Sequence, residues 1–276
     1  MRRGKNQMSH EHKQKVTAVF DTASEGYDNP SQRFFVNTAS FLVESMRLSG
    51  GEQLLDVATG TGHVAVAAAQ ALKDGKVTGI DISDGMLQRA KAKAAALGLT
   101  NVEFLRRDIE DMGFADGAFD AATCSFGLFF LPDIEKGLRC ISKVIKPGGR
   151  LHLTSFAPSM MQPMRGMLND LLKTRHGIET PLFSARMDSP EKIAALLEAA
   201  GYRDIKIQSA QMGYYLKDSG QWRDILLNTA YRNQFQMLSE EEVERLLDEH
   251  LAEVDRLADA NGIWLDVEVL FAEGAV

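Results

Sequence analysis

A strand, a glycine-rich turn and a helix follow one another between Leu54 and Ala69, and this succession constrains the fold more than any other feature. An apolar run ends at Asp56, the chain turns through Gly60 and Gly62, and a run of small residues suited to a closely packed helix follows. Because glycine has no Cβ, backbone N–H groups at such a turn can approach a ligand closely. The pattern predicts a parallel α/β unit with a ligand site at the end of its first strand.

Strand and helix patterns then alternate along the chain, which is typical of a parallel sheet with right-handed crossovers. The expected strands are residues 53–57, 76–81, 102–107, 119–124, 150–155 and 204–210. The expected helices are residues 16–27, 40–47, 62–73, 84–97, 133–145, 190–200, 218–237 and 239–259. Residues 264–271 alternate in polarity and predict a last strand, which we expect to be antiparallel because it follows a helical pair. We therefore expect a Rossmann-like, doubly wound, mostly parallel seven-stranded sheet with an antiparallel last strand and helical lid insertions.

The chain of 276 residues is long enough for one large α/β domain with insertions. We expect a disordered tail over residues 1–15 and a single domain over 16–276. Within that domain we expect a cofactor-binding core at 38–156 and lid or substrate-pocket segments at 16–37, 157–188 and 218–260.

The composition indicates a cytoplasmic protein. A net charge of −7 disfavours nucleic acid as a partner, and we find no apolar run long enough for stable membrane insertion. Two cysteines make no disulfide framework, and we expect no metal site. We expect a monomer or a homodimer.

Acidic residues at the ends of successive strands indicate which nucleoside binds. Asp81 ends the strand after the glycine turn, about twenty residues further on, where a carboxylate suits the two hydroxyls of a ribose. The turn also fits a relaxed dinucleotide pattern, but Asp56 beside it would repel a pyrophosphate and attract a cation. Asp108 adds a third acid at the same edge. These carboxylates favour a ligand with a sulfonium, an ammonium and an adenosine over a nicotinamide dinucleotide.

The chain resembles class I S-adenosylmethionine-dependent methyltransferases in four motifs that occur in order within residues 50–156. These are Asp56-Val-Ala-Thr-Gly-Thr-Gly62, Ile80-Asp-Ile-Ser-Asp-Gly-Met-Leu87, Arg107-Asp-Ile109 and Lys146-Pro-Gly-Gly149. Within that class it is most similar to the ubiquinone and menaquinone C-methyltransferase group. The likeness there is carried by Val19-Phe-Asp-Thr-Ala-Ser-Glu-Gly-Tyr-Asp28 and Ser125-Phe-Gly-Leu128. The quinone enzymes continue with Arg-Asn, whereas this chain continues with Phe129 and Phe130.

The resemblance implies S-adenosylmethionine as cofactor and S-adenosylhomocysteine as product. It implies that Asp81 binds the ribose hydroxyls, that the loop of Gly60, Thr61 and Gly62 lies under the methionine part, and that Asp56 reaches the ammonium. The other cofactor-binding residues that it implies are Tyr27, Ala58, Ile82, Met86, Asp108, Ile109 and Ser125. Of these, Asp108 is expected at the adenine amino group, Met86 on the adenine face and Ser125 at the sulfonium end.

Aromatic residues outside the motifs predict the acceptor. The residues expected to line an apolar pocket are Phe126, Phe129, Phe130, Tyr214, Trp222 and Tyr231. Such a pocket predicts a small or medium, apolar or aromatic acceptor. His63, at the start of a helix, is a candidate general base, although transfer from an activated sulfonium mainly requires alignment.

Several alternatives remain at this point. The chain could be a quinone-biosynthesis C-methyltransferase, an NAD-dependent oxidoreductase or a non-catalytic cofactor-binding module. The acceptor, the methylated atom (oxygen, nitrogen or carbon) and the use of a general base stay open.

Overall fold

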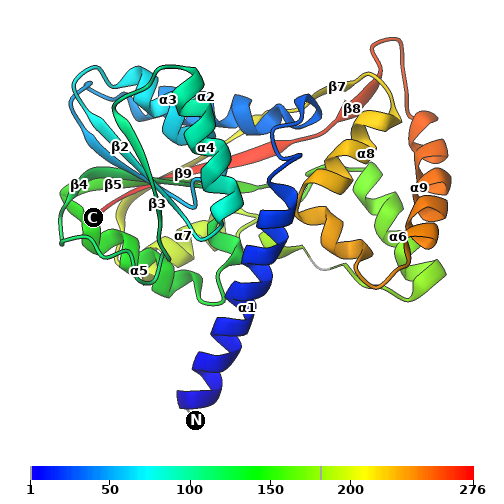
Figure 1. The fold of residues 1–276 in the computed structure, drawn as a ribbon, viewed down its shortest axis with the longest axis horizontal. Coiled ribbons are helices and arrows are strands. Elements are labelled where there is room, and N and C mark those ends of the chain that lie inside the picture. Colours follow the sequence, from blue (N-terminus) through cyan, green and yellow to red (C-terminus); the bar gives the residue numbers. More distant parts are fainter. Residues whose placement is uncertain (1, 181) are drawn as a thin grey trace.

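A seven-stranded sheet lies at the centre of the molecule (Figure 1). The computed structural model describes residues 2–180 and 182–276, with side chains from residue 11 onward. The strands are β1 (Gln53–Val57), β2 (Lys76–Asp81), β3 (Val102–Arg106), β4 (Phe119–Ser125), β5 (Ile145–Phe156), β6 (Arg203–Gln211) and β9 (Glu268–Ala275). Their order is β3-β2-β1-β4-β5-β9-β6, and β9 runs opposite to the other six of these strands. The predicted mostly parallel sheet with an antiparallel last strand is therefore confirmed.

Helices cover both faces of this sheet. One face carries α2 (Phe34–Met46), α3 (His63–Ala71) and α4 (Asp84–Ala96), and the other carries α5 (Ile134–Val144) and α7 (Pro190–Ala199) (Figure 1). With both faces covered, the central strands are apolar almost throughout, as parallel strands usually are. Leu54 and Leu55 of β1 have no exposed surface. Asp56 follows them and lies opposite Gly79 of β2 and Thr123 of β4, so the register places this acid at the carboxyl edge of the sheet.

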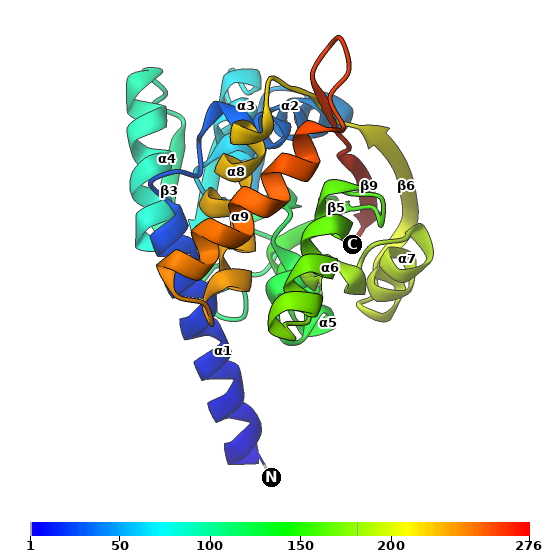
Figure 2. The ribbon, with the colours of Figure 1, turned by 90° about the vertical axis from the view of Figure 1, so that its right-hand side faces the viewer.

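A further group of helices stands beside the sheet and approaches this edge (Figures 1 and 2). It consists of α6 (Met164–His176), α8 (Ser219–Asn228), α9 (Glu240–Asp255) and the short 3-10 helix η4 (Ala230–Phe235). The other 3-10 helices are η1 (Pro30–Gln32), η2 (Leu128–Phe130) and η3 (Phe183–Arg186). The N-terminal helix α1 (Arg2–Ala23) contacts α4 of the sheet layer and η4 of the helical group.

The N-terminal segment differs from its prediction, which was a disordered tail over residues 1–15 followed by a helix over 16–27. Residue 1 lies outside the described residues, and helix α1 begins at Arg2. Lys13 Nζ lies 2.6 Å from a carboxylate oxygen of Asp108, and His12 Nε2 lies 2.8 Å from the carbonyl oxygen of Phe130. The prediction of a disordered tail is wrong for the part of α1 that these contacts hold in place. A polar local pattern cannot reveal partners that lie about a hundred residues away in sequence.

The C-terminal region also differs from its prediction of one strand over residues 264–271. It contains β8 (Ile263–Leu265), which pairs with β7 (Tyr214–Leu216) in a separate two-stranded sheet, and then β9. The side-chain oxygen of Gln211, at the end of β6, accepts hydrogen bonds from the backbone N–H groups of Gly213, just before β7, and Val267, just before β9, at 2.8 and 2.9 Å. This side chain satisfies the backbone where the strand is interrupted, which the alternation of residues alone does not show.

Trp222 belongs to the core of the helical group, and its prediction as a pocket residue is wrong. The side chain is fully buried, and its indole Nε1–H donates a 2.8 Å hydrogen bond to Nε2 of His250 on α9. Burial lowers the pKa of His250 to about 4, because the imidazolium would lose its hydration.

This histidine makes the stability of the protein depend on pH. Between about pH 6.5 and about 4, unfolded His250 takes up a proton and folded His250 does not, so acidification favours unfolding. We expect this group to contribute a loss of at most about 3 kcal/mol in the free energy of unfolding across that window. The variant His250→Gln keeps an acceptor for Trp222 and should lose less stability on acidification, as measured by urea unfolding at each pH. Identical pH dependence in both proteins would contradict the assignment.

Candidate active site

The glycine loop after β1 has the backbone conformation that the sequence predicts for a close approach to a ligand. Ala58, Gly60 and Gly62 all have positive φ angles, of 53°, 54° and 82°. A Cβ on Gly60 would meet nothing within 4 Å, so this residue opens onto free space. A Cβ on Gly62 would lie 3.0 Å from the Ala90 Cβ, so this glycine allows α3 to pack against α4. The two glycines therefore serve different needs.

Asp81 closes the loop from the end of β2. Its carboxylate accepts hydrogen bonds from the backbone N–H of Gly60 and of Ser83, each at 2.9 Å. Burial raises its pKa, and the two N–H donors oppose that shift. Each of these hydrogen bonds uses one carboxylate oxygen, and an ionised carboxylate offers further lone pairs on both. Asp81 can therefore fix the loop and still accept from a ligand.

Asp56 lies beneath the same loop. Only 2% of the residue is exposed, and its carboxylate accepts from the hydroxyls of Thr59 and Thr123, at 2.6 and 2.7 Å. Burial raises the pKa of Asp56 to about 6, and the two hydroxyls oppose that shift. The residue is thus an anion at neutral pH in a place with little water, where it attracts a cation strongly.

The third predicted acid, Asp108, closes the site at the end of β3. Its carboxylate is paired with Lys13 of α1 at 2.6 Å, and the same ammonium lies 2.7 Å from Glu110. Helix α1 is therefore attached to the site by charge. Asp108 retains exposed surface, with 32% of its side chain accessible, so it can accept a further hydrogen bond.

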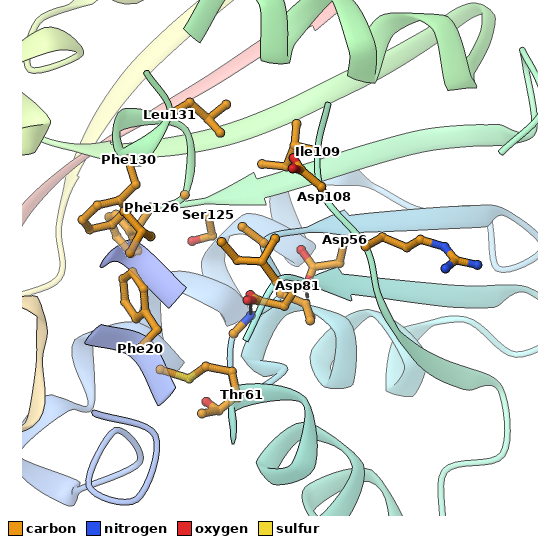
Figure 3. A pocket seen from close by; sticks show the side chains of 18 of the residues that line it. Phe20, Asp56, Thr61, Asp81, Asp108, Ile109, Ser125, Phe126, Phe130 and Leu131 are labelled. Atoms are coloured by element: carbon orange, nitrogen blue, oxygen red, sulfur yellow. Dashed lines mark hydrogen bonds between the residues drawn. The ribbon is translucent and has the colours of Figure 1, made fainter. Parts of the chain in front are cut away.

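These elements surround a cavity of about 1070 Å³, which we call the first cavity. All of the predicted cofactor-binding residues line it except Gly62, which lies behind the loop. Figure 3 shows Phe20, Phe126 and Phe130 on one side of the pocket and Asp56, Asp81, Asp108 and Ile109 on the other, with Ser125 between the two groups. The sequence reasoning thus selected residues that the fold does bring together. It missed His12, Lys13, Val16 and Phe20, which α1 contributes.

An apolar cavity of about 750 Å³, the second cavity, adjoins the first. The two share a wall of aromatic side chains, namely Phe20, Tyr27, Phe35, Phe126 and Phe130. The wall is held by ring contacts, with Phe20 edge-on to Phe130 at 5.1 Å between centroids and Phe126 stacked on Phe156 at 4.1 Å. A planar aromatic molecule in the second cavity would contact the wall that also bounds the first.

Four of the six predicted acceptor-pocket residues line the second cavity: Phe126, Phe129, Phe130 and Tyr231. Trp222 is in the helical core, as described, and the prediction for Tyr214 is also wrong. The Tyr214 hydroxyl donates to the carbonyl of Ser31 at 2.7 Å, and the Arg33 guanidinium lies 3.6 Å from the centre of its ring. These contacts attach β7 to the segment before α2. The sequence missed Phe34 and Phe35, whose signal is an adjacent aromatic pair ahead of the first strand.

His63 lines the first cavity, but both of its ring nitrogens are engaged. Its Nε2 lies 3.0 Å from Asp28, and its Nδ1 lies 3.2 Å from the ammonium of Lys93. The Lys93 ammonium can only donate, so Nδ1 accepts and Nε2–H donates to Asp28. Burial alone would raise the pKa of Asp28, but hydrogen bonds from His63 and Thr61 and the Lys93 charge lower it below its usual value. This geometry gives His63 a role in anchoring Asp28 and leaves it no free lone pair for a substrate proton.

Comparison with known proteins identifies the family. The profile of the ubiE/COQ5 methyltransferase family matches residues 8–173, which is more than half of the chain. The chain therefore belongs to this family and is an S-adenosylmethionine-dependent methyltransferase. Membership confirms the resemblance found in the sequence and removes the oxidoreductase and non-catalytic alternatives.

Individual relatives agree on the class and differ in the part that they match. Aklanonic acid methyltransferase DauC of Streptomyces sp. (strain C5) is 29% identical over 215 residues, which span 73% of this chain and 98% of DauC. The ubiquinone/menaquinone biosynthesis C-methyltransferase UbiE of Cronobacter sakazakii is 34% identical over 155 residues, spanning 54% of this chain and 62% of UbiE. A SAM-dependent methyltransferase from Aquifex aeolicus has the same fold, with a TM-score of 0.54 at 23% identity over 68% of this chain and 89% of that one.

The residues of the first cavity fit the cofactor that the family uses. Open space beside Gly60 leaves room for a ligand against the backbone, and Asp81 and Asp56 place acceptors for hydroxyl and ammonium donors around that space. No helix within residues 2–180 or 182–276 is both long and apolar enough to cross a bilayer.

Proposed function

We propose that this methyltransferase acts on a small planar aromatic acceptor of the quinone-like or polyketide type, bound in the second cavity. The observation that carries the proposal is the pair of cavities with a shared aromatic wall. The first cavity has acidic side chains and a glycine loop, and the second is lined mainly by phenylalanine and methionine. The relatives DauC and UbiE, named for an aromatic polyketide acid and for quinones, support an acceptor of this kind.

We propose the following roles in the first cavity. Asp81 accepts from the ribose hydroxyls, while the loop of Gly60 and Thr61 lies under the methionine part and Asp56 holds the ammonium. Asp108 accepts at the adenine edge beside Ile109, Met86 packs on the adenine ring, and Ser125 lies toward the aromatic wall. S-adenosylmethionine, when bound, supplies a methyl group on a sulfonium that is already a good leaving group.

The work left to the protein is alignment and exclusion of water. The aromatic wall presents flat surfaces against which a planar acceptor can stack, which restricts its orientation relative to the first cavity. A water-poor site also favours the reaction, because the sulfonium loses its charge during transfer. No free base is needed for an acceptor that is already ionised, in keeping with the engaged nitrogens of His63.

We further propose that the segments 16–37, 157–188 and 218–260 act as lids over a core at 38–156. The first of these segments supports this, because its Phe20, Tyr27 and Phe35 line both cavities. A cytoplasmic location, a monomeric or homodimeric state and the absence of nucleic acid among the partners remain predictions.

Binding of the cofactor product should depend on pH through Asp56. S-adenosylhomocysteine keeps its ammonium over the range of interest, whereas Asp56 becomes neutral below its pKa of about 6. Its affinity should therefore fall as the pH is lowered from about 7.5 to about 5, by up to about tenfold per pH unit below the pKa. In Asp56→Asn the affinity at about pH 7.5 should be lower and the pH profile flatter. Isothermal titration calorimetry measures both, and an unchanged profile in the variant would rule out Asp56 as the ammonium partner.

The proposed function is tested by following labelled methyl groups. The protein is incubated with methyl-labelled S-adenosylmethionine and one candidate acceptor at a time, drawn from hydroxylated anthraquinones, reduced naphthoquinones, simple aliphatic amines and duplex DNA. We expect label in the planar aromatic compounds only. Label in amines or DNA, with none in the aromatic compounds, would contradict the proposal.

A quinone acceptor is favoured specifically by the family match. In that case, deletion of the gene from its source organism should cause demethylated quinone to accumulate in lipid extracts. A normal quinone profile would exclude a quinone acceptor and leave an acceptor of the polyketide type.

A further inference from the structure

Arg165 on α6 is a buried cation with no anion to neutralise it among the described residues. Only 5% of the residue is exposed. Its Nη2 donates to the carbonyl oxygen of Pro158 at 2.9 Å, but Nε and Nη1 have no hydrogen-bond partner in the described part of the chain. A buried charge without a partner is costly, because water is lost and nothing replaces it. Such a group calls for an explanation beyond packing.

Other arginines in this chain show what a structural one looks like. Arg175, two to three turns further along α6, is 61% exposed at its side chain and lies 2.7 Å from Glu249 of α9. Arg223 of α8 is paired with Glu244 in the same way, at 2.7 Å. These pairs join helices at the surface, and Arg165 has no equivalent.

The unpartnered groups around Arg165 connect it to the second cavity. Its guanidinium lies near the hydroxyl of Tyr231 and interacts with it through its charge and a long hydrogen bond. This hydroxyl is also buried and has no hydrogen bond of good geometry among the described residues. Tyr231 lines the second cavity, and so does Gln234, whose side-chain oxygen is likewise buried without a partner. Both residues belong to η4.

The chemistry of this end of the cavity differs from the rest. Burial raises the pKa of Tyr231 to about 12, although the Arg165 charge opposes the shift, so the phenol keeps its proton at neutral pH. A protonated phenol in front of a guanidinium presents a hydrogen-bond donor backed by positive charge. Away from this end the walls are mainly phenylalanine, methionine and leucine side chains, and the polar side chains that also line the cavity (Tyr27, Ser184, Thr229, Asn233 and Gln234) carry no positive charge.

We propose that the η4 end of the second cavity binds a carboxylate of the methyl acceptor, with the Tyr231 hydroxyl as donor and the Arg165 guanidinium as the neutralising charge. This inference rests on the proposed function, because it takes the second cavity as the acceptor site. Tyr231 and Gln234 line the second cavity, and neither lines the first among the residues described. The carboxylate is therefore a recognition group and not the atom that is methylated.

A neutral polar group would not serve in the same place. A carbonyl or an amide could accept from Tyr231, but the Arg165 charge would stay uncompensated in a medium of low dielectric. An anion offsets that cost, so the substrate itself completes the ion pair. The acceptor is thus a planar aromatic acid, and Arg165 determines specificity without contacting the transferred methyl group.

Two probes that differ only in charge test the proposal: anthraquinone-2-carboxylate and anthraquinone-2-carboxamide. Their dissociation constants are measured by isothermal titration calorimetry with the protein saturated in S-adenosylhomocysteine. The wild type should bind the carboxylate at least about tenfold more tightly than the amide. Arg165→Met should abolish this preference, Arg165→Lys should restore part of it, and Tyr231→Phe should reduce it. Arg175→Met on the same helix is the matched control and should keep the full preference.

Thermal unfolding separates recognition from a structural role. Removing an unpaired buried cation should leave the melting temperature of Arg165→Met unchanged or higher, whereas a structural arginine would lower it. Should Arg165→Met fold poorly, the Lys and Phe variants still report the preference. Equal affinity of the wild type for the two probes, no binding of either, or a preference that survives in Arg165→Met and Tyr231→Phe would overturn the proposal. S-adenosylhomocysteine binding is measured first, so a failure of the cofactor site is distinguished from a failure of the carboxylate site.

Discussion

Replacing Asp81 with asparagine is expected to weaken the binding of S-adenosylhomocysteine by about 100-fold and to reduce methyl transfer at least as much. The carboxylate has two tasks that an amide cannot combine. It accepts from the N–H groups of Gly60 and Ser83, and in the proposed complex it also accepts from the ribose hydroxyls. Hydrogen bonds to a charged group contribute about 1.5–3 kcal/mol each, so the loss of about one of them, or about 2.7 kcal/mol, corresponds to this factor.

The matched control is Asp84→Asn, three residues further on. Its carboxylate is 61% exposed and pairs with Arg106, so its replacement should change the affinity by no more than about twofold. Isothermal titration calorimetry gives the two affinities, and thermal unfolding shows whether both variants are folded. Wild-type affinity in a folded Asp81→Asn protein would mean that the ribose is not held at the end of β2.

Filling the second cavity should stop methyl transfer while leaving the cofactor product bound. Ala230 lines the second cavity at the start of η4 and does not line the first among the described residues. A phenyl ring at this position would occupy the space of a planar acceptor, because the cavity walls are close-packed and cannot give way cheaply. In Ala230→Phe we expect turnover of the best aromatic acceptor to fall by at least about 100-fold, or about 2.7 kcal/mol in the barrier. The dissociation constant of S-adenosylhomocysteine should stay within about twofold of the wild type.

Ala185 of η3 offers the control for this variant. It is exposed and lies next to Ser184, which lines the second cavity. Ala185→Phe adds the same ring outside the cavity and should keep full turnover. Equal loss in both variants, or loss of S-adenosylhomocysteine binding in Ala230→Phe, would show that the cavities do not divide the two ligands as proposed.

The cofactor half of the site could be predicted because its residues lie at the ends of strands. Once residues 53–57, 76–81 and 102–107 are recognised as parallel strands, Asp56, Asp81 and Asp108 must meet at one edge of the sheet. The local sequence pattern is therefore enough to predict that these three acids lie close together. The register in the structure, with Asp56 opposite Gly79, follows from the same apolar pattern.

For the acceptor-binding half of the site, the sequence could predict only the kind of residue that lines the pocket. Trp222, Tyr214 and Tyr231 all lie in the C-terminal half of the chain, and no periodicity distinguishes them. Their different positions depend on partners far away in sequence: His250 for Trp222 and Ser31 for Tyr214. The contacts of Lys13 with Asp108, and of Arg165 with Tyr231, are equally invisible to local reasoning. Aromatic residues in the sequence predict an apolar pocket, but tertiary packing decides which of them line it.

A crystal structure of the protein with S-adenosylhomocysteine and anthraquinone-2-carboxylate tests the division of the site most directly. The account predicts the ribose at Asp81 in the first cavity and the ring system against Phe126 and Phe130 in the second. A nucleoside bound in the second cavity, or an aromatic ring bound outside it, would contradict the account.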